Sequence, residues 1–362
     1  MNTEETRETK KRKPTGRVKT NIPELDEMLG GGLAPGLHCV TGGPSSYKSA
    51  TLLQIAYLAA MDGFATEYIT DEIGVIECMA RLTTRKMFVN MCSQITQPCG
   101  DFSWSDMERM FTESGESGQI DEVPGGIVDE ESFMSLLNQS WGELREVVRA
   151  DLIGGAPGML HIKEMGDYLE RSWTEHNAFE WLFGGHDRYF TSLMQRSKKD
   201  REFFDDVMHG TANLIVIDPV NSLRTCEWQS VGGEEVRDNT PESKRALMEQ
   251  HVELLDNWGR STGTAIIGVF HKHRTANKYP QPPSMGDFKE TSCIEYRAVS
   301  AWEFVRADDM RWSNHPKPPK VPEGTEAVAL YLLKSRAGRR TEHNGPIWLC
   351  ADGAHNLIYP LE

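Results

Sequence analysis

The sequence predicts an α/β fold, with a mostly parallel central sheet flanked by helices and a largely helical insertion at about residues 93–205. Apolar runs in the first half of the chain are almost continuous, and helical patterns separate them. Such runs are typical of parallel strands buried on both faces. The insertion is indicated by a change of composition, since residues 112–132 contain seven acidic residues and no basic one.

Composition limits the class of protein. The longest apolar runs of the 362-residue chain, such as residues 264–270, are too short to span a bilayer, and the first residues have no apolar core. We therefore expect a cytoplasmic protein without a membrane anchor. Seven cysteines without a C-x-x-C pair argue against a disulfide framework or a zinc ribbon. A formal charge of −15 argues against a protein that coats nucleic acid with its whole surface, but it leaves room for a local basic channel.

The first elements lead to a glycine-rich loop. Residues 1–19 are polar, with four consecutive basic residues at 10–13, and we interpret them as a disordered tail. A single domain over residues 20–362 then begins with a short helix at 25–29, a glycine break and an apolar strand at 37–41. After the loop, apolar residues recur at helical spacing until Asp62 and Gly63.

The remaining elements follow the same alternation. A second strand at 64–70 precedes a second helix at 74–88. Short apolar runs bounded by turn residues predict further strands at 159–164, 213–218, 264–270, 300–305, 327–335 and 346–351.

The loop "GGPSSYKS" matches the phosphate-binding pattern G-x-x-x-x-G-K-[ST] except for Tyr47, which stands where glycine is expected. In such a loop, backbone N–H groups and the helix dipole converge on phosphate, with Lys48 adding positive charge and Ser49 offering its hydroxyl to Mg²⁺. The predicted nucleotide-binding residues are Gly42, Gly43, Pro44, Ser45, Ser46, Tyr47, Lys48 and Ser49. Alone, the motif is equally compatible with a surface turn.

Three polar residues at strand ends extend the pattern. Asp218 closes an apolar strand and is suited to hold magnesium, although many α/β proteins end a strand in Asp. Glu72, directly after the second strand, would polarise the attacking water or simply favour a helix start. His271 would sense a γ-phosphate or be solvated. Together they predict an ATP and Mg²⁺ site.

A pair of cations stands near the end of the strand at 327–335. Lys334 and Arg336 share one face of an extended strand. They are either a surface pair or an arginine finger with its companion, which would neutralise transition-state charge on a neighbouring subunit's nucleotide. The serial order of loop, glutamate, aspartate, sensor and Lys-x-Arg strand favours the second interpretation.

At these motifs, residues 20–92 and 205–362 resemble the RecA-like motor domain of DnaB-type replicative helicases, including phage relatives. "GGPSSYKSATLLQIA", "YITDEIGVIECMARL", "LIVIDPVNSLR", "IIGVFHKHR" and "LLKSRAGRRTEHNGPIWLCADG" carry the resemblance. It implies a RecA-like P-loop ATPase that forms a homo-oligomeric, usually hexameric ring around single-stranded DNA, hydrolyses ATP and unwinds duplex DNA in replication.

The resemblance also implies residue roles. Lys48 and Ser49 would bind phosphate and Mg²⁺, Glu72 would activate water, and Asp218 would complete the metal site. His271 would replace a glutamine sensor, and Lys334 and Arg336 would act in trans. Loops at 224–245 and 272–285 would face the bore, with single-stranded DNA contacted by Arg224, Lys272, Arg274 and Lys278.

Departures from the family pattern keep alternatives open. Tyr47 replaces glycine, His271 replaces glutamine, the bacterial amino-terminal domain has no counterpart beyond 19 polar residues, and 146 positions separate Glu72 from Asp218. A strained backbone at Tyr47 would cost ~1–3 kcal/mol, or about 5- to 150-fold in affinity, which predicts weakened ATP binding. The opening "IPELDEMLGGGLAPG" is also similar to KaiC-like and RadA-like ATPases, which regulate or recombine without unwinding. A non-catalytic assembly protein is the third alternative.

The insertion offers a possible surface for a replication partner. Trp173, Phe179, Trp181, Leu182 and Phe183 recur at near-helical spacing. Such a stripe is more often a small core than an interface.

Overall fold

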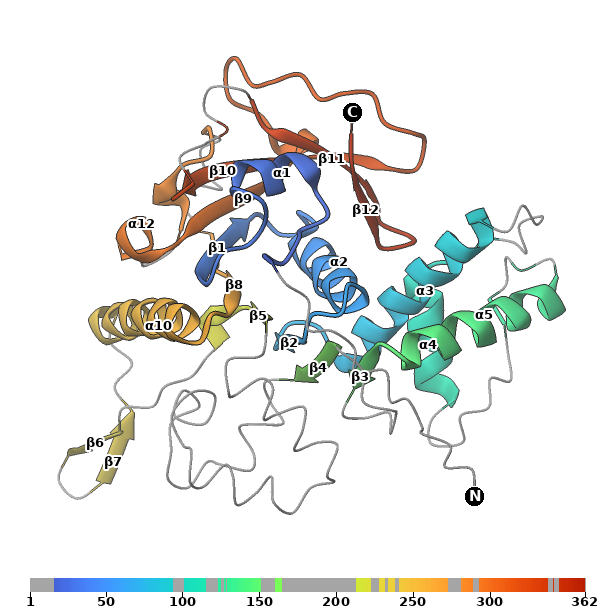
Figure 1. The fold of residues 1–362 in the computed structure, drawn as a ribbon, viewed down its shortest axis with the longest axis horizontal. Coiled ribbons are helices and arrows are strands. Elements are labelled where there is room, and N and C mark those ends of the chain that lie inside the picture. The colour runs from blue at the N-terminus through green and yellow to red at the C-terminus, as the bar shows by residue number, and fades with distance from the viewer. Residues whose placement is uncertain are drawn as a thin grey trace, which may run out of the picture.

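The computed structural model describes residues 16–93, 101–114, 123–124, 127, 129–150, 160–164, 213–222, 228–231, 234–237, 241–272, 281–288, 293–337, 341 and 345–361. Its centre is a ten-stranded sheet in the order β12-β11-β10-β9-β1-β8-β5-β2-β4-β3 (Figure 1). From β9 to β3 all neighbours pair in parallel, whereas β10, β11 and β12 pair antiparallel at one edge. The predicted α/β fold with a mostly parallel sheet is confirmed.

The strands lie close to their predicted positions. They are β1 (Gly36–Gly42), β2 (Thr66–Thr70), β3 (Val148–Ala150), β4 (Leu160–Glu164), β5 (Leu214–Asp218), β8 (Ala265–Val269), β9 (Ser300–Arg306), β10 (Glu326–Ser335), β11 (Ile347–Asp352) and β12 (Leu357–Pro360). The sequence analysis missed β3 and β12, which are three and four residues long and lie at the two edges of the sheet. Edge strands this short carry little periodic signal.

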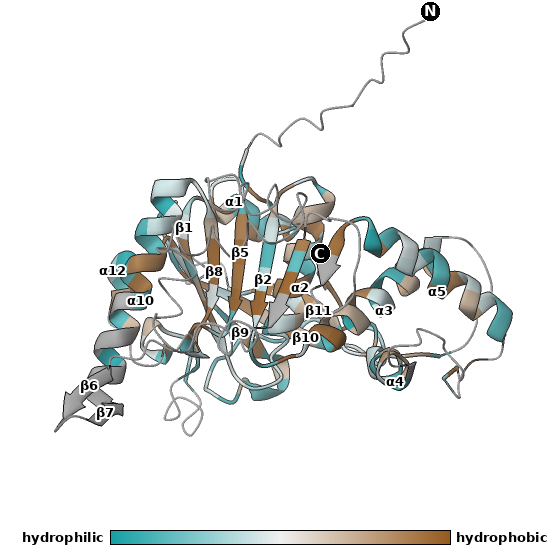
Figure 2. Ribbon diagram, turned by 90° about the horizontal axis from the view of Figure 1, so that it is seen from below, coloured by the Kyte–Doolittle hydropathy of each residue, from teal (hydrophilic) through white to brown (hydrophobic). Residues whose placement is uncertain are grey.

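Helices cover both faces of the sheet, as the continuous burial of β1, β2, β5 and β8 requires. One face packs against α2 (Lys48–Met61) and α3 (Val75–Ser93), with residues such as Leu53, Tyr68 and Trp302 in its core. The other face packs against α10 (Pro241–Thr262) and α12 (Cys293–Arg297), with Val252 and Phe270 in its core. The sheet strands are the most apolar part of the ribbon (Figure 2).

The start of the predicted insertion is helical. α4 (Trp104–Ser114) and α5 (Glu130–Arg145) pack on α3 around a separate apolar cluster that includes Met87, Phe102 and Phe133 (Figure 1). Asp129 caps α5, because its side chain accepts a hydrogen bond from the Ser132 N–H at 3.0 Å. The chain then returns to the sheet as β3 and β4, so sheet strands interrupt the predicted insertion.

Short elements complete the fold. They are α1 (Pro23–Met28), the 3₁₀ turns η2 (Val220–Ser222), η3 (Met285–Asp287) and η4 (Ala307–Asp309), and a hairpin of β6 (Trp228–Val231) and β7 (Glu234–Arg237). The hairpin and the first turn of α10 lie within residues 224–245, where the sequence predicted only a loop. Among the described helices, none combines the length and apolarity needed to cross a bilayer.

Candidate nucleotide site

The glycine-rich loop connects β1 to α2 at the carboxyl edge of the sheet. Gly42 has φ +157°, and a β-carbon there would lie 2.6 Å from the Phe304 carbonyl oxygen and 2.7 Å from Ser46 Oγ. Only glycine fits such a close approach between the loop and β9. No side chain caps the first turn of α2, and that turn contains no acidic residue. Its free N–H groups and positive dipole end make it suited to an anion.

Tyr47 adopts the left-handed conformation that glycine usually supplies, with φ +64° and ψ +17°. Its ring packs against the apolar core, and its hydroxyl lies where a β-carbon on Gly353 would come within 3.0 Å. Burial raises the pKa of the Tyr47 phenol, and the neighbouring Glu326 carboxylate raises it further. The side chain is therefore directed toward the C-terminal strands, and only the Tyr47 backbone belongs to the loop's inner surface.

Lys48 turns back over the loop. Its ammonium donates to the Gly43 carbonyl oxygen at 2.8 Å and to Ser46 Oγ at 3.4 Å. Burial lowers the Lys48 pKa, while the Asp218 and Glu72 carboxylates oppose the shift. An ammonium held by two neutral acceptors gains from exchanging them for phosphate oxygens, because charge-assisted hydrogen bonds are stronger.

Asp218 closes β5 and is buried. Tyr68 Oη donates to Asp218 Oδ2 at 2.9 Å, whereas Oδ1 is buried and makes no hydrogen bond of standard geometry. Burial raises the Asp218 pKa, and the nearby Ser49 hydroxyl and Tyr68 phenol lower it. A buried carboxylate oxygen without a partner, next to a serine hydroxyl, fits a magnesium ion. In the described residues no three His, Cys, Asp or Glu side chains could hold a metal by themselves, so such a cation would also need phosphate oxygens.

Glu72 and His271 meet across the mouth of the site. His271 Nε2 lies 3.3 Å from Glu72 Oε1, and the His271 backbone N–H donates to Asn221 Oδ1 at 2.8 Å. The hydrogen bond from His271 lowers the Glu72 pKa, against an opposing effect of burial. The side chains of both residues are about half exposed. Glu72 is thus an ionised, accessible carboxylate next to Lys48 and Asp218.

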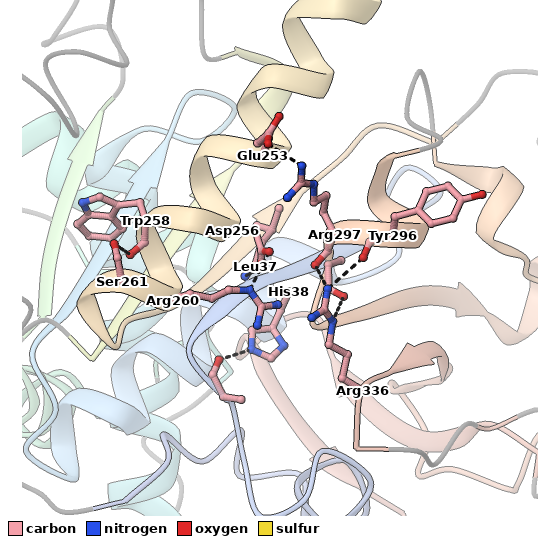
Figure 3. A network of polar contacts seen from close by, with 12 residues as sticks. Leu37, His38, Glu253, Asp256, Trp258, Arg260, Ser261, Tyr296, Arg297 and Arg336 are labelled. Carbon is pink, nitrogen blue, oxygen red and sulfur yellow. Dashed lines mark hydrogen bonds and ion pairs between the residues drawn. The ribbon is translucent and has the colours of Figure 1, made fainter.

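Lys334 and Arg336 lie at the opposite edge of the sheet. Ser335 pairs with Ser300 at the start of β9, whereas Gly42 pairs with Phe304 near its end. Both cations bind the last turn of α12 and the residue after it (Figure 3). Lys334 Nζ donates to the Ile294 and Glu295 carbonyl oxygens, and the Arg336 guanidinium donates to those of Tyr296, Arg297 and Ala298. Within one chain they cannot reach its own phosphate loop.

The predicted DNA contacts are less well placed. Arg224, Arg274 and Lys278 lie outside the described residues. Lys272 is described, and its ammonium lies 2.6 Å from Oε1 of the buried Glu303. In this structure that ammonium is a partner for a carboxylate of its own chain, and it is not displayed for DNA.

Sequence reasoning missed three residues that shape the site. Tyr68 orients Asp218, Asn221 holds the His271 backbone, and Glu303 pairs with Lys272. Only Glu303 left a signal in the sequence, because it is the one charged residue in the apolar run "SAWEFV".

Comparison with solved structures agrees with this geometry. The described fold is similar to a solved helicase ATPase domain, with a TM-score of 0.59 at 13% identity, covering 97% of this chain and 94% of that one. It is also similar to a DnaB-like replicative helicase whose structure was solved with its interactions with primase, with a TM-score of 0.58 at 14% identity. That alignment covers 96% of this chain and 62% of the helicase.

The chain has the RecA-like fold of a DnaB-like helicase ATPase domain. No family model matches the sequence. A curated relative, the DNA repair protein RadA of Listeria monocytogenes serovar 1/2a (strain ATCC BAA-679 / EGD-e), is 38% identical over 66 residues. This match spans 18% of the chain and only 14% of RadA. The resemblance of the RecA-like fold to DnaB-type motor domains, predicted from the motifs, is confirmed at the level of structure.

Proposed function

We propose that this chain is an ATP-hydrolysing motor that assembles with copies of itself into a hexameric ring, moves on single-stranded DNA and unwinds duplex DNA during replication. The observation that carries the proposal is the convergence of Lys48, Glu72, Asp218 and His271 from four distant segments on one end of the parallel sheet. The acidic overall charge is compatible with a ring whose bore alone is basic.

Each residue would have a distinct role in hydrolysis. The α2 N-terminus and Lys48 would bind the phosphates, and Ser49 with Asp218 would hold Mg²⁺, which would neutralise phosphate charge. Glu72, kept ionised by His271, would accept a proton from the attacking water. His271 would report the presence of the γ-phosphate to the segment that follows it. Arg336 and Lys334 of one subunit would serve the nucleotide of the next.

The proposal is tested by ATPase rates with and without single-stranded DNA, alongside particle size and displacement of a strand from a forked duplex. We expect DNA-stimulated hydrolysis, a ring-sized particle and ATP-dependent displacement. Lys48→Ala and Glu72→Gln should both abolish turnover, and Glu72→Gln should still bind ATP, because its side chain does not hold phosphate. Turnover by Glu72→Gln at the wild-type rate would exclude Glu72 as the base.

A second candidate is a RadA-like ATPase that acts in repair or recombination without unwinding. The 66-residue similarity to RadA favours it. Hydrolysis stimulated by DNA without strand displacement would support this candidate over the helicase. A non-catalytic assembly protein would instead fail to bind a labelled ATP analogue at millimolar concentration.

The predicted insertion is the part of the chain with no assigned role, and we propose it as a surface for a replication partner. α4 and α5 are attached to the motor through an apolar cluster with α3, and the Trp104 N–H donates to the Ala354 carbonyl oxygen at 2.9 Å. The aromatic stripe at 173–183 that suggested a partner lies outside the described residues. Pull-down of replication proteins by the chain with and without residues 166–212 tests this surface.

A further inference from the structure

A buried charged cluster lies beside the phosphate site and has no part in the roles assigned above. Glu303, in the middle of β9, has a fully buried side chain. Its Oε1 lies 2.6 Å from Lys272 Nζ, and the same ammonium lies 4.0 Å from Asp287 Oδ2. Glu303 Oε2 and the hydroxyl of Tyr331, on the neighbouring strand, are buried without a hydrogen-bond partner in the described part of the chain.

The cluster borders the nucleotide site directly. Glu303 pairs in register with Thr41, the residue before Gly42. Both Glu303 and Lys272 act on the charge of Lys48, the first raising and the second lowering its pKa. Lys272 is also the residue after His271. A change at the phosphates therefore has a short path to the Lys272–Glu303 pair.

The same pair closes the base of the segment between Lys272 and Phe288. These two residues form an antiparallel bridge. Asp287 closes the other end through a reciprocal capping box with Ser284, whose N–H donates to Asp287 Oδ2 at 3.0 Å. Lys272 thus holds both ends of the segment, one through its backbone and one through its ammonium. This segment contains Arg274 and Lys278, two of the predicted DNA contacts.

Stability does not explain the cluster. Burial raises the pKa of Glu303 to about 8, the Lys272 ammonium opposes that shift, and the Asp287 carboxylate adds to it. Removing two charges from water offsets most of their attraction, so apolar residues of similar volume are usually at least as stable at such positions. A charged pair kept there points to a role beyond packing.

We propose that Glu303 is a positioning residue that, by holding Lys272, couples nucleotide at the phosphate loop to single-stranded DNA at segment 273–283. When phosphate draws His271 toward the loop, Lys272 moves with it against the anchor that Glu303 provides, and the base of the segment changes with the nucleotide state. This inference rests on the proposed function, because it requires that the chain binds both ligands.

The test is the linkage between the two ligands in the full-length chain. The affinity for a fluorescent oligothymidylate is measured with and without a saturating non-hydrolysable ATP analogue, for wild type, Glu303→Gln, Lys272→Met and the double variant. The ratio of the two affinities is the coupling, and it is unaffected by the fraction of protein that is folded. We expect each single variant to lower this ratio at least 5-fold, and the double variant to lower it no further, since both residues act as one unit.

A control variant separates coupling from folding. Lys272→Leu with Glu303→Leu replaces the charged pair by an apolar one and should melt at or above the wild-type temperature while losing the coupling. It carries the test if a single variant does not fold. Coupling retained in Glu303→Gln or in the apolar double variant, with normal coupling in wild type, overturns the inference alone. Wild-type protein that binds the analogue but shows no linkage to DNA overturns the inference and the proposed function together.

Discussion

Tyr47 fills the space that Gly353 leaves empty. A β-carbon on Gly353 would lie 3.0 Å from the Tyr47 hydroxyl and 3.5 Å from its Cε1, so the phenol and the turn after β11 are complementary. Arg306, which forms an ion pair with Glu326 at 2.9 Å, stands beside the same phenol. The tyrosine that interrupts the phosphate-loop pattern thus joins the loop to the C-terminal strands.

This relationship changes the consequence expected from strain at Tyr47. The left-handed backbone is already present in the chain without nucleotide, so its conformational cost falls on folding and not on binding. We predict that Tyr47→Gly alters the Kd for ATP by less than ~3-fold, well below the change that strain released on binding would give. Fluorescence titration with a labelled ATP analogue measures it.

Ser45 provides the matched control for this prediction, because it also has a positive φ, +53°, in the same loop and its side chain is exposed. Ser45→Gly should likewise leave the Kd nearly unchanged. A tenfold gain in affinity for Tyr47→Gly, absent from Ser45→Gly, would show that the tyrosine restrains the loop against nucleotide.

The Tyr68–Asp218 hydrogen bond predicts an effect on magnesium. With Tyr68 donating to Oδ2, the Asp218 carboxylate presents Oδ1 toward the site. Tyr68→Phe removes this orientation and should weaken Mg²⁺ activation about 10-fold, the usual effect of losing a group that orients a metal ligand. The Mg²⁺ dependence of labelled-analogue binding measures it without relying on turnover.

Tyr57→Phe is the control, since Tyr57 is also buried in the same core and its ring lies near Arg85, not Asp218. Equal Mg²⁺ dependence in both variants would mean that Asp218 does not need the phenol, or does not bind the ion.

His38 predicts how stability depends on pH. Its Nε2–H donates to the Ala34 carbonyl oxygen at 2.8 Å, and its Nδ1 accepts from Ser300 Oγ at 2.7 Å, which requires the neutral ring. Burial lowers the His38 pKa to about 4. The unfolded chain takes up a proton below about pH 6.5 while the folded chain does not, so stability should fall by about 3 kcal/mol between pH 6.5 and 4.

Urea unfolding at a series of pH values from 7.5 to 4 measures this dependence, and His38→Gln should flatten it. A variant as steep as wild type would assign the acid sensitivity to other groups, of which His251, buried with a pKa lowered to about 4, is the first candidate.

The sequence predicted the parallel core well because each strand there is a short apolar run with no competing pattern. It also predicted which residues stand at strand ends, and parallel topology then brings Glu72, Asp218 and His271 to one edge. What it did not predict depends on contacts between distant segments. The direction of the Tyr47 ring depends on Gly353, and the burial of Lys272 depends on Glu303. The β6–β7 hairpin was missed because the surrounding polar residues resemble a loop.

The contacts of Arg336 with α12 make its predicted role testable in two steps. Arg336 donates to three carbonyl oxygens in and after the last turn of α12, and the next residue on that helix surface, Arg297, binds Glu253 of α10 (Figure 3). Arg336→Ala should abolish turnover without weakening nucleotide binding by the isolated subunit, because the guanidinium lies far from its own phosphate loop. If Arg336→Ala hydrolyses ATP normally, the inter-subunit site is wrong.

Mixing two inactive variants distinguishes action in trans from support of α12. In rings formed from equal amounts of Arg336→Ala and Lys48→Ala subunits, about a quarter of the interfaces join an intact phosphate loop to an intact Arg336. Hydrolysis should return at these interfaces, since each variant supplies what the other lacks. A mixture as inactive as its components, with rings of normal size, would instead limit Arg336 to capping α12 within its own subunit.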